Sequence, residues 1–465
     1  MKKIKIFPLL LLLCLVLTAA APGAWALEDP QIPALAAVLV DLDSGRVLYE
    51  KNMDEERAPA SLTKVMTVLL AFEALERGQV AMEDMVTAGT DCREGMDESS
   101  STAGILPGMT LSFRELLYCA MISSANEACN IIASHLAGSV RAFVDQMNQR
   151  AGELGCTHTH FVNTNGLPAE GHYSSAYDLY LITREALKFP EFISICDTKT
   201  YQPTLSALND GKPLVNSNAL LTPDGAYGDQ YVYEYASGVK TGYTRAAGYC
   251  LISTAEKDGL RALAVVMGSD GYLNANIDEY RNFEASIDLY DWFFDNFSYQ
   301  TLLSASAVIE QAPVEFAQDG AKASLVPMES ITALVPKDLA EEDVQSAVTV
   351  FEDRLVAPIA PGTVLGEVTV TVNGVDYGTV RLVNTANIAL ARSEYMRMRV
   401  AQVFSNRFVL ISLAVLALFL LLYLILVLRY RALRRKILRQ RRLAEKRRRQ
   451  EAMERQYSGN TRRRR

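Results

Sequence analysis

The chain has 465 residues, of which 49% are hydrophobic and 22% are charged, and its formal net charge at pH 7 is −8. This balance is that of ordinary globular protein with room for about two or three domains, and by itself it indicates no activity. The seven cysteines are too widely spaced for a disulfide-dense scaffold or a zinc site. We therefore expect mostly buried thiols, and a single disulfide bridge is the alternative for one pair of them.

The N-terminus has the order of a secretory signal. Three lysines among the first five residues precede an apolar run at residues 6–20, and residues 24–26 have the small-x-small pattern of a cleavage site. We expect residues 1–26 to be a signal peptide that is cleaved after Ala26. An uncleaved anchor is the alternative, but the apolar run is short for a membrane span, which needs about 20 residues.

The first part of the mature chain combines a predicted hairpin with a predicted buried helix. The β-type runs at residues 36–41 and 46–50 are separated by Leu42-Asp43-Ser44-Gly45, which predicts two paired strands. From Leu62 to Arg77 apolar residues recur with the i, i+3, i+4, i+7 spacing of a helix, and Gly78 is placed to end it. Further apolar residues fall between these positions, so we expect this helix to be largely buried.

Three more helices are expected further along. Ser112-Phe113-Arg114-Glu115 is a capping-box sequence, so a helix should begin there and run to about Ser123. A second helix is expected from Glu127 to Ala137, closed by Gly138. A third, amphipathic helix is expected near residues 278–297.

Between these helices, three adjacent strands are expected at residues 238–244, 248–255 and 260–267. The last two are joined by a turn that contains Asp258-Gly259, so the three strands would form one antiparallel sheet. After residue 297 the sequence changes to short β-branched runs separated by turn residues, which predicts a second, smaller, all-β domain at residues 298–393.

A membrane-spanning helix and a basic tail are expected at the C-terminus, after a juxtamembrane stalk at residues 394–407. Residues 408–428 carry no charge, and 21 residues are long enough to cross the hydrocarbon core. Residues 429–465 hold 17 lysines and arginines against three glutamates, a charge of +14 that leaves −22 for the rest of the chain.

This asymmetry predicts an orientation. Basic flanks stay in the cytoplasm, so we expect the tail inside the cell and the acidic bulk of the chain outside it. The tail could also hold anionic lipid headgroups. Nucleic acid is not expected as a partner, because only two tyrosines interleave with the basic residues.

Three short motifs follow one another: Ser61-Leu62-Thr63-Lys64, Ser124-Ala125-Asn126 and Lys240-Thr241-Gly242. The spacing of the first motif places Lys64 one helical turn after Ser61 on the same face. A lysine amine takes the proton of a hydroxyl only when it is neutral, and desolvation with a second cation nearby would lower its pKa towards the working range. The alternative, which fits most such sequences, is an N-cap serine followed by a solvated lysine.

The other two motifs could line a cleft beside this pair. Ser124 and Asn126 fall between two predicted helices, where their side chains either point into a cleft or cap a helix. Lys240 and Thr241 lie on a predicted strand, and Gly242 lets another chain approach the strand edge closely. A substrate could pair there as an added strand, with its terminal carboxylate on the cation and the hydroxyl.

The ordered set of motifs resembles that of the penicillin-interacting serine acyl-transferases. Segments similar to the low-molecular-weight D-alanyl-D-alanine carboxypeptidases are residues 59–67, 126–129, 160–163 with 166–167, and 238–242. The resemblance covers about residues 36–297 and continues more loosely through the β domain. It implies an α/β (α+β) catalytic domain at residues 27–297, of the penicillin-binding and serine β-lactamase type, in which helices flank an antiparallel sheet.

The resemblance also implies the roles of four catalytic residues. Ser61 would be the acylated nucleophile and Lys64 the general base. Ser124 and Asn126 would take part in proton relay and substrate anchoring.

Four further residues would bind substrate. Lys240 and Thr241 would receive the terminal carboxylate, and Gly242 would admit the substrate backbone. The backbone N–H groups of Tyr243 and Ser61 would form the oxyanion hole.

Two features depart from the pattern of that family. Ala125 and Glu127 stand where Gly and Asp are common, a small change in a tight loop that could alter rate or antibiotic affinity. The full membrane span with a cytoplasmic tail replaces the amphipathic helix of the best-known members, which changes anchoring and leaves the chemistry alone.

The resemblance implies a serine-type D-alanyl-D-alanine carboxypeptidase that removes the terminal D-alanine from peptidoglycan pentapeptides through an acyl-enzyme and is inhibited by β-lactams. Its partners would be the stem peptide, β-lactam antibiotics and the cell membrane, and no cofactor or metal is expected. A β-lactamase shares the motifs, but no convincing Glu-x-x-Leu-Asn sequence follows the middle motif. A non-catalytic wall-binding protein with the same fold is the alternative from another class.

A Ser-His-Asp hydrolase is a weaker rival. The chain has four histidines and no Gly-x-Ser-x-Gly elbow, so nothing in the sequence places a histidine beside a serine. His158 and His160 have the spacing of an H-x-H metal pair, but satisfied surface or core histidines are the simpler interpretation.

Overall fold

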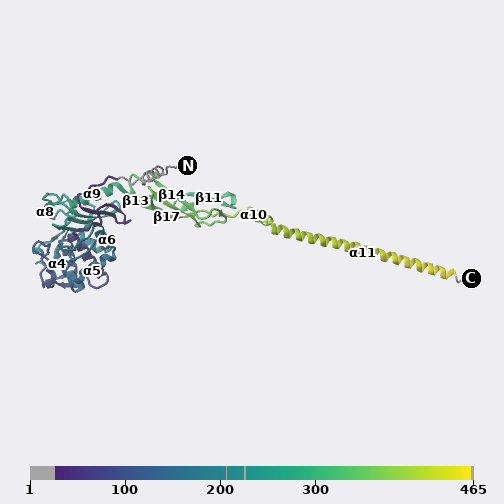
Figure 1. Cartoon of the computed structure of the whole chain (residues 1–465), viewed down its shortest axis with the longest axis horizontal. Helices are drawn as coiled ribbons and strands as arrows, with labels where there is room; N and C mark the ends of the chain where they lie inside the picture. The colour runs from purple at the N-terminus through teal and green to yellow at the C-terminus, as the bar shows by residue number, and fades with distance from the viewer. Residues whose placement is uncertain (1–26, 206, 225–226, 462–465) are drawn as a thin grey trace, which may run out of the picture. The chain divides into compact units, whose positions relative to one another are not determined.

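The computed structural model describes residues 27–205, 207–224 and 227–461 (Figure 1). The predicted signal peptide at residues 1–26 lies outside the described residues and stays a prediction. The described chain divides into two compact units. The first extends to Leu302 and includes residues 331–345 and 371–377, and the second holds the remaining residues from Leu303 onwards.

The first unit is built on a five-stranded antiparallel sheet with the order β2-β1-β9-β8-β7. Its strands are β1 (Ala36–Asp41), β2 (Val47–Lys51), β7 (Ala236–Thr244), β8 (Gly248–Lys257) and β9 (Leu260–Ser269). The predicted hairpin and the three predicted strands therefore belong to one sheet. Strand β7 is an edge of this sheet, so its outer side is open to other segments.

The two faces of the sheet pack against different helices. Alternate side chains of a strand point to opposite faces. Val38 and Val40 of β1 join the core that contains α2, α3, α4 and α6, whereas Ala37 and Leu39 join the core of α9. Figure 1 shows α4, α5 and α6 on one side of the sheet and α9 on the other.

The helices of this unit are η1 (Ala60–Thr63), α2 (Lys64–Glu76), α3 (Phe113–Met121), α4 (Asn126–Ala137), α5 (Val140–Glu153), α6 (Ala176–Ala186), α7 (Pro190–Cys196), α8 (Tyr272–Ala275) and α9 (Arg281–Asn296). Short 3₁₀ turns are η2 (Thr90–Arg93) and η3 (Leu208–Gly211), and two small ribbons pair β3 (Met85–Thr87) with β4 (Thr110–Ser112) and β5 (Thr200–Tyr201) with β6 (Leu214–Val215).

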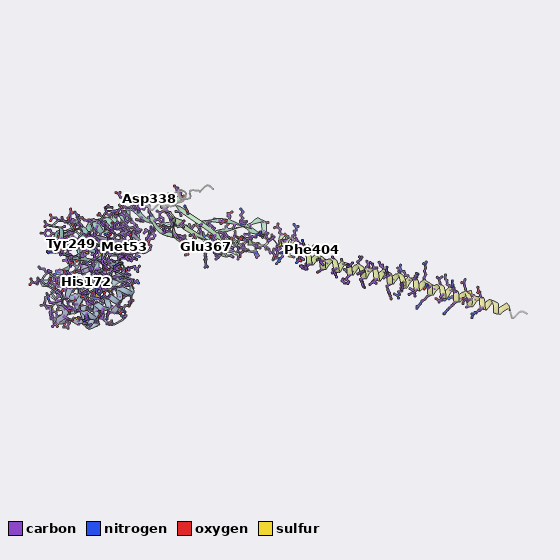
Figure 2. All side chains as sticks on the ribbon, viewed as in Figure 1. Met53, His172, Tyr249, Asp338, Glu367 and Phe404 are labelled. Carbon is purple, nitrogen blue, oxygen red and sulfur yellow. The ribbon has the colours of Figure 1, made fainter. Side chains whose placement is uncertain are left out.

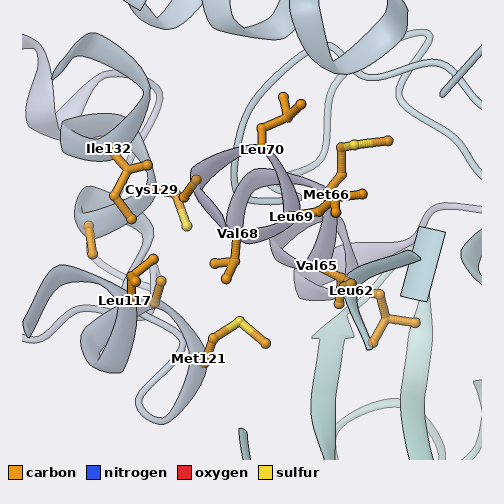
Figure 3. Packing of buried hydrophobic residues seen from close by; sticks show 14 of the residues in the cluster. Leu62, Val65, Met66, Val68, Leu69, Leu70, Leu117, Met121, Cys129 and Ile132 are labelled. Atoms are coloured by element: carbon orange, nitrogen blue, oxygen red, sulfur yellow. The ribbon is translucent and has the colours of Figure 1, made fainter. Parts of the chain in front are cut away.

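The predicted buried helix is α2, and it is enclosed by other helices. Figure 3 shows Val68 of α2 pointing towards side chains of α3 and α4 that include Leu117 and Ile132, whereas Leu69 lies on the other side of α2. The first turn differs from the prediction, since residues 60–63 form a 3₁₀ turn before the α-helix begins at Lys64.

The predicted capping box is present at the start of α3. The Ser112 hydroxyl accepts a hydrogen bond from the Glu115 N–H at 3.2 Å, and Glu115 Oε2 accepts one from the Ser112 N–H at 3.3 Å. The helix ends at Met121, two residues earlier than predicted. The chain then reaches Ser124, whose φ of +58° is left-handed and does not continue a helix.

The C-terminal part contains the predicted all-β fold. A six-stranded sheet has the order β14-β16-β17-β12-β11-β15, and a separate ribbon pairs β10 with β13. The strands are β10 (Phe297–Leu303), β11 (Glu310–Glu315), β12 (Lys322–Pro327), β13 (Ile331–Pro336), β14 (Val344–Val350), β15 (Leu355–Val356), β16 (Val364–Val372) and β17 (Val375–Asn384), with 3₁₀ turns η4 (Gln318–Gly320) and η5 (Glu341–Asp343).

Two helices end the described chain. The predicted stalk at residues 394–407 is helical over most of its length, within α10 (Arg392–Ser405). Helix α11 (Arg407–Thr461) then continues through the apolar segment into the basic tail. It contains the single helical stretch, among the described residues, that is long and apolar enough to cross a membrane. Its apolar side chains are exposed and project from the ribbon (Figure 2), as fits a membrane anchor.

The six cysteines in the described part of the chain are all free thiols. Five are buried, and Cys156 is partly exposed. The single disulfide bridge that was the alternative from the sequence is absent among these six residues.

Candidate active site

Ser61 lies in the 3₁₀ turn η1, directly before α2. The turn is tightly constrained, because Ala60 has a left-handed φ of +48° and Gly166 crosses beneath it with a φ of +91°. A Cβ atom on Gly166 would lie 1.7 Å from the Ala60 carbonyl oxygen and 2.9 Å from the Ser61 nitrogen. Only glycine therefore allows the two backbones to approach this closely.

Lys64 is the first residue of α2, and its side chain is fully buried. Its Nζ lies 2.8 Å from Ser61 Oγ, 2.7 Å from Asn126 Oδ1 and 2.7 Å from the carbonyl oxygen of Asn165. The two oxygens of Asn126 and Asn165 can only accept. When the amine is neutral, its two N–H groups are used by these oxygens and its lone pair faces the Ser61 hydroxyl.

Burial favours this neutral form. Removal from water lowers the pKa of Lys64 to about 8, although the thiol of Cys129 and the carboxylate of Glu127 act in the opposite direction. The structure thus has the predicted contact between the Ser61 hydroxyl and the Lys64 amine. With a pKa of about 8, the amine can lose its proton at a pH slightly above neutral.

The carbonyl of Asn165 was not predicted from the sequence. It is aimed at Lys64 by a turn in which Asn163 Oδ1 accepts from the N–H of Gly166 at 2.7 Å. The Asn163 amide also donates to the Leu167 carbonyl at 2.8 Å, and Asn165 Oδ1 accepts from the Leu167 N–H at 3.1 Å. The Asn165-Gly166 pair is a turn signal in the sequence, but nothing local indicates what the turn faces.

The middle motif is brought to Lys64 in part. Asn126 is the first residue of α4, and its backbone N–H donates to the Ser101 carbonyl at 3.0 Å while its side chain contacts Lys64. Ser124 lies in the preceding loop and is 8% exposed. Its hydroxyl makes no hydrogen bond to any residue that the structure describes, so its predicted relay role stays a prediction.

Glu127, which with Ala125 departs from the expected middle motif, anchors a loop beside the site. It is fully buried, and its Oε1 accepts from the Thr102 hydroxyl at 2.7 Å and from the N–H groups of residues 103–105 at 2.8, 3.1 and 3.2 Å. One carboxylate oxygen thus fixes residues 102–105, which directly follow Ser101 of the cleft. Its other oxygen, Oε2, is buried without a partner among the described residues.

The third motif lies on the edge strand β7. Lys240 is 1% exposed, and its Nζ donates to the Thr241 carbonyl at 3.1 Å. Burial and then the charge of Lys64 lower the pKa of Lys240 to about 7. The sequence placed this cation at an open strand edge, whereas the structure buries it. The Thr241 hydroxyl lies 2.5 Å from the hydroxyl of Ser217, a neighbour that sequence analysis missed.

Gly242 brings the strand against the helix tip. A Cβ atom at this position would lie 3.2 Å from both the Ala60 Cβ and the Ser61 nitrogen, which is tighter than ordinary packing. The next residue, Tyr243, packs its ring against Tyr249 with the centroids 4.4 Å apart. The edge of β7 is therefore held directly beside Ser61. The predicted approach of a substrate backbone at Gly242 stays a prediction.

These segments surround a cleft with a volume of about 530 Å³. Ser61, Asn126 and Tyr243 line it, together with Asn165 and Gly166. The other residues that line it, which we call its rim, are Asp97, Ser99, Ser100, Ser101, Leu167, Pro168, Thr244, Arg245 and Leu273.

A buried histidine supports the helix tip. His172 Nδ1 accepts from the Val162 N–H at 2.9 Å, so the ring proton is on Nε2, which donates to the Thr63 hydroxyl at 2.9 Å. Burial lowers the pKa of His172 to about 4, which keeps it neutral. No cluster of three or more metal-binding side chains occurs among the described residues, and His160 contacts the carbonyl of Gly171 at 2.7 Å.

Family models match most of the chain. The model described as D-alanyl-D-alanine carboxypeptidase matches residues 24–271, and the model described as penicillin-binding protein 5, C-terminal domain, matches residues 297–389. The chain is 34% identical over 371 residues to D-alanyl-D-alanine carboxypeptidase DacF of Bacillus subtilis (strain 168), with 78% of this chain and 90% of that protein covered. It is 32% identical over 362 residues to D-alanyl-D-alanine carboxypeptidase DacC of Escherichia coli (strain K12), with 76% and 85% covered.

Solved structures are similar over the same region. Penicillin-binding protein 5 from Haemophilus influenzae has a TM-score of 0.58 and 28% sequence identity, with 78% of this chain and 99% of that chain covered. Penicillin-binding protein 6B from Escherichia coli has a TM-score of 0.59 and 27% identity, with 77% and 98% covered.

The close crossing at Gly166 can be tested by comparison with Gly155. Both glycines have a left-handed φ, +91° and +85°, but a Cβ on Gly155 would meet nothing within 4 Å. We expect Gly155→Ala to lower the free energy of unfolding by about 1 kcal/mol, the cost of the backbone conformation alone. Gly166→Ala should cost about 2 kcal/mol more, because the helix tip must move. Urea unfolding measures both values, and equal losses would contradict the crossing.

Proposed function

The chain belongs to the D-alanyl-D-alanine carboxypeptidase family, and on that basis we propose that it removes the terminal D-alanine from peptidoglycan stem peptides, with Ser61 as its nucleophile. The observation that carries this proposal is the Ser61 hydroxyl, 2.8 Å from a buried amine whose two N–H groups have other acceptors. Such an amine is a general base for the hydroxyl to which its lone pair points.

In the first half of the reaction, Ser61 Oγ attacks the carbonyl carbon between the two D-alanines, and Lys64 takes the hydroxyl proton. In this proposal the developing oxyanion is held by the backbone N–H groups of Ser61 and Tyr243. The short distance of 3.2 Å between a Cβ on Gly242, the residue before Tyr243, and the Ser61 nitrogen supports this assignment. The C–N bond then breaks, and the leaving amine takes the proton from Lys64. A water molecule cleaves the resulting ester in the second half, with Lys64 again accepting and returning one proton.

The terminal carboxylate of the substrate is bound by Lys240 and Thr241 in this proposal. Burial lowers the pKa of Lys240 to about 7, so the free enzyme contains both its charged and its neutral form near neutral pH. A carboxylate placed beside it favours the charged form, so binding and protonation would reinforce each other. Asn126 Oδ1 accepts from Lys64 in the free enzyme, and its amide group remains available to anchor the peptide backbone.

β-Lactam antibiotics are proposed inhibitors, since ring opening by Ser61 gives an acyl-enzyme whose leaving amine stays attached.

Two rival functions predict different products. A β-lactamase would release hydrolysed penicillin rapidly, and a non-catalytic wall-binding protein would release nothing. Purified pentapeptide and benzylpenicillin, incubated separately with the full chain, distinguish the three cases, and released D-alanine supports the carboxypeptidase.

The nucleophile is tested by Ser61→Ala in the full chain. We expect D-alanine release to fall by about 10⁴-fold or more, because loss of a nucleophile removes the covalent route. Intact-mass measurement after benzylpenicillin treatment should show an adduct on the parent chain and none on the variant. Ser123→Ala is the matched control, because that hydroxyl donates to the Cys119 carbonyl outside the cleft. A penicillin adduct on Ser61→Ala would refute the assignment.

The two lysines predict the pH dependence of the reaction. Lys64 must be neutral, so kcat should rise with pH and level off above about 8. Lys240 must be charged to bind the free substrate, so kcat/KM should rise and then fall with increasing pH, because Lys240 loses its proton. Lys240→Arg keeps its charge at high pH and should remove the falling limb. A falling limb that is unchanged in Lys240→Arg would contradict this role.

We further propose that α11 spans the cell membrane, with the catalytic domain outside and the basic tail in the cytoplasm. The 17 basic residues after the apolar segment support this orientation. They also make the tail an excellent trypsin substrate. With an epitope tag fused after Arg465, trypsin added to intact spheroplasts should digest the catalytic domain and leave the tag protected. Loss of the tag before lysis would show the opposite orientation.

A further inference from the structure

Two opposite charges face the cleft and are not paired. Asp97 and Arg245 are the charged residues among those that line the described cleft, and both are exposed. Arg245 makes no ion pair or hydrogen bond with any described residue. Asp97 Oδ1 accepts from the N–H and hydroxyl of Ser99 at 2.9 and 2.7 Å and from the Ser100 hydroxyl at 3.0 Å. Neither charge is thus satisfied by a partner of opposite sign.

Both groups stand on well-supported segments. Ser100 is 8% exposed, and its hydroxyl also accepts from the Asp97 N–H at 3.0 Å, while Glu127 fixes the same loop a few residues later. The hydrogen bonds from Ser99 hold the pKa of Asp97 below its usual range, which keeps it charged. Arg245 follows Thr244, the last residue of β7, whose hydroxyl closes the turn by accepting from the Ala247 N–H at 3.1 Å.

The direction of the substrate along β7 places one residue at this rim. In the proposed function the terminal carboxylate lies at Lys240 and Thr241, and the carbonyl that is attacked lies at the N–H of Tyr243. The acyl part of the peptide therefore continues towards Arg245. Arg245 is two residues beyond Tyr243 and directly follows the end of β7, so it lies at most roughly 7 Å further along the chain. That distance reaches the residue that precedes the D-alanine being acylated.

We propose that Asp97 and Arg245 recognise the side chain of this third stem-peptide residue, and that the preferred side chain ends in a carbon bearing both an ammonium and a carboxylate, as in a diamino-dicarboxylic acid. Asp97 accepts from the ammonium, and Arg245 donates to the carboxylate. A lysine-type side chain, which ends in an ammonium alone, would satisfy Asp97 and leave Arg245 unpaired. This inference rests on the proposed function, because that function sets the direction of the peptide.

The test is a cycle of two variants and three peptides, measured as kcat/KM for D-alanine release by the full chain. The peptides are pentapeptides that carry meso-diaminopimelate, its side-chain carboxamide, or L-lysine at the third position. We expect the parent chain to prefer the free carboxylate over the amide by about fivefold, the modest size typical of exposed charge pairs. Arg245→Gln should reduce this ratio to about one and leave the lysine peptide unchanged.

Asp97→Asn should lower kcat/KM about equally for all three peptides, because each retains its ammonium. Arg141→Gln is the matched control, an exposed arginine of α5 that does not line the cleft. Acylation by benzylpenicillin, which has no third residue, should stay within about twofold in every variant and reports an intact site.

Equal kcat/KM values for the carboxylate and amide peptides in the parent chain would overturn the inference and leave the proposed function intact. So would an Arg245→Gln variant that loses activity on all three peptides and on benzylpenicillin alike. Absence of D-alanine release from every peptide would overturn the proposed function, and this inference with it.

Discussion

A lysine amine that is closed off from water must either lose its proton or have every N–H paired, and this constraint shapes the active-site end of the molecule. Lys64 is fully buried, and two of its three neighbouring oxygens can only accept. The amine is therefore stable in a form that points a lone pair at Ser61. The segments that pack around Ser61 supply oxygen acceptors to this amine or exclude water from it. The lowered pKa of Lys64 is therefore a result of burial by the whole site.

Close backbone contact makes this burial possible. Gly166 and Gly242 bring a loop and an edge strand against the same helix tip. A Cβ atom would clash with the backbone at Gly166 and would be tightly packed at Gly242. Behind the tip, α2 is surrounded by α3, α4 and α6, so the position of Lys64 is fixed by a packed core. His172 adds a neutral hydrogen-bond bridge to the first turn. The site is thus rigid where the proton moves.

The rim of the site is built differently from its base. Its loop is held by one carboxylate oxygen of Glu127, and its charges face solvent and remain unpaired. The buried contacts around Lys64 depend on one another, so a substitution there disturbs several of them at once. Exposed residues that line the cleft can be substituted at little cost in stability. Glu127 belongs to the buried part of the site, because it is fully buried and its carboxylate acts against the burial that lowers the pKa of Lys64. Its hydrogen bonds are nevertheless with residues 102–105, and none of them goes to Lys64.

The sequence by itself determined the elements whose signals are local: the apolar period of α2, the capping box of α3, the strands of the antiparallel sheet, the all-β part and the apolar segment of α11. It also predicted the contact between Ser61 and Lys64, because one helical turn separates them. Only the tertiary structure decided that Lys240 is buried, that the Asn165 carbonyl faces Lys64 and that the Ser124 hydroxyl has no described partner. These facts depend on contacts between segments tens of residues apart, and a local pattern fixes the conformation of a segment without fixing what it meets.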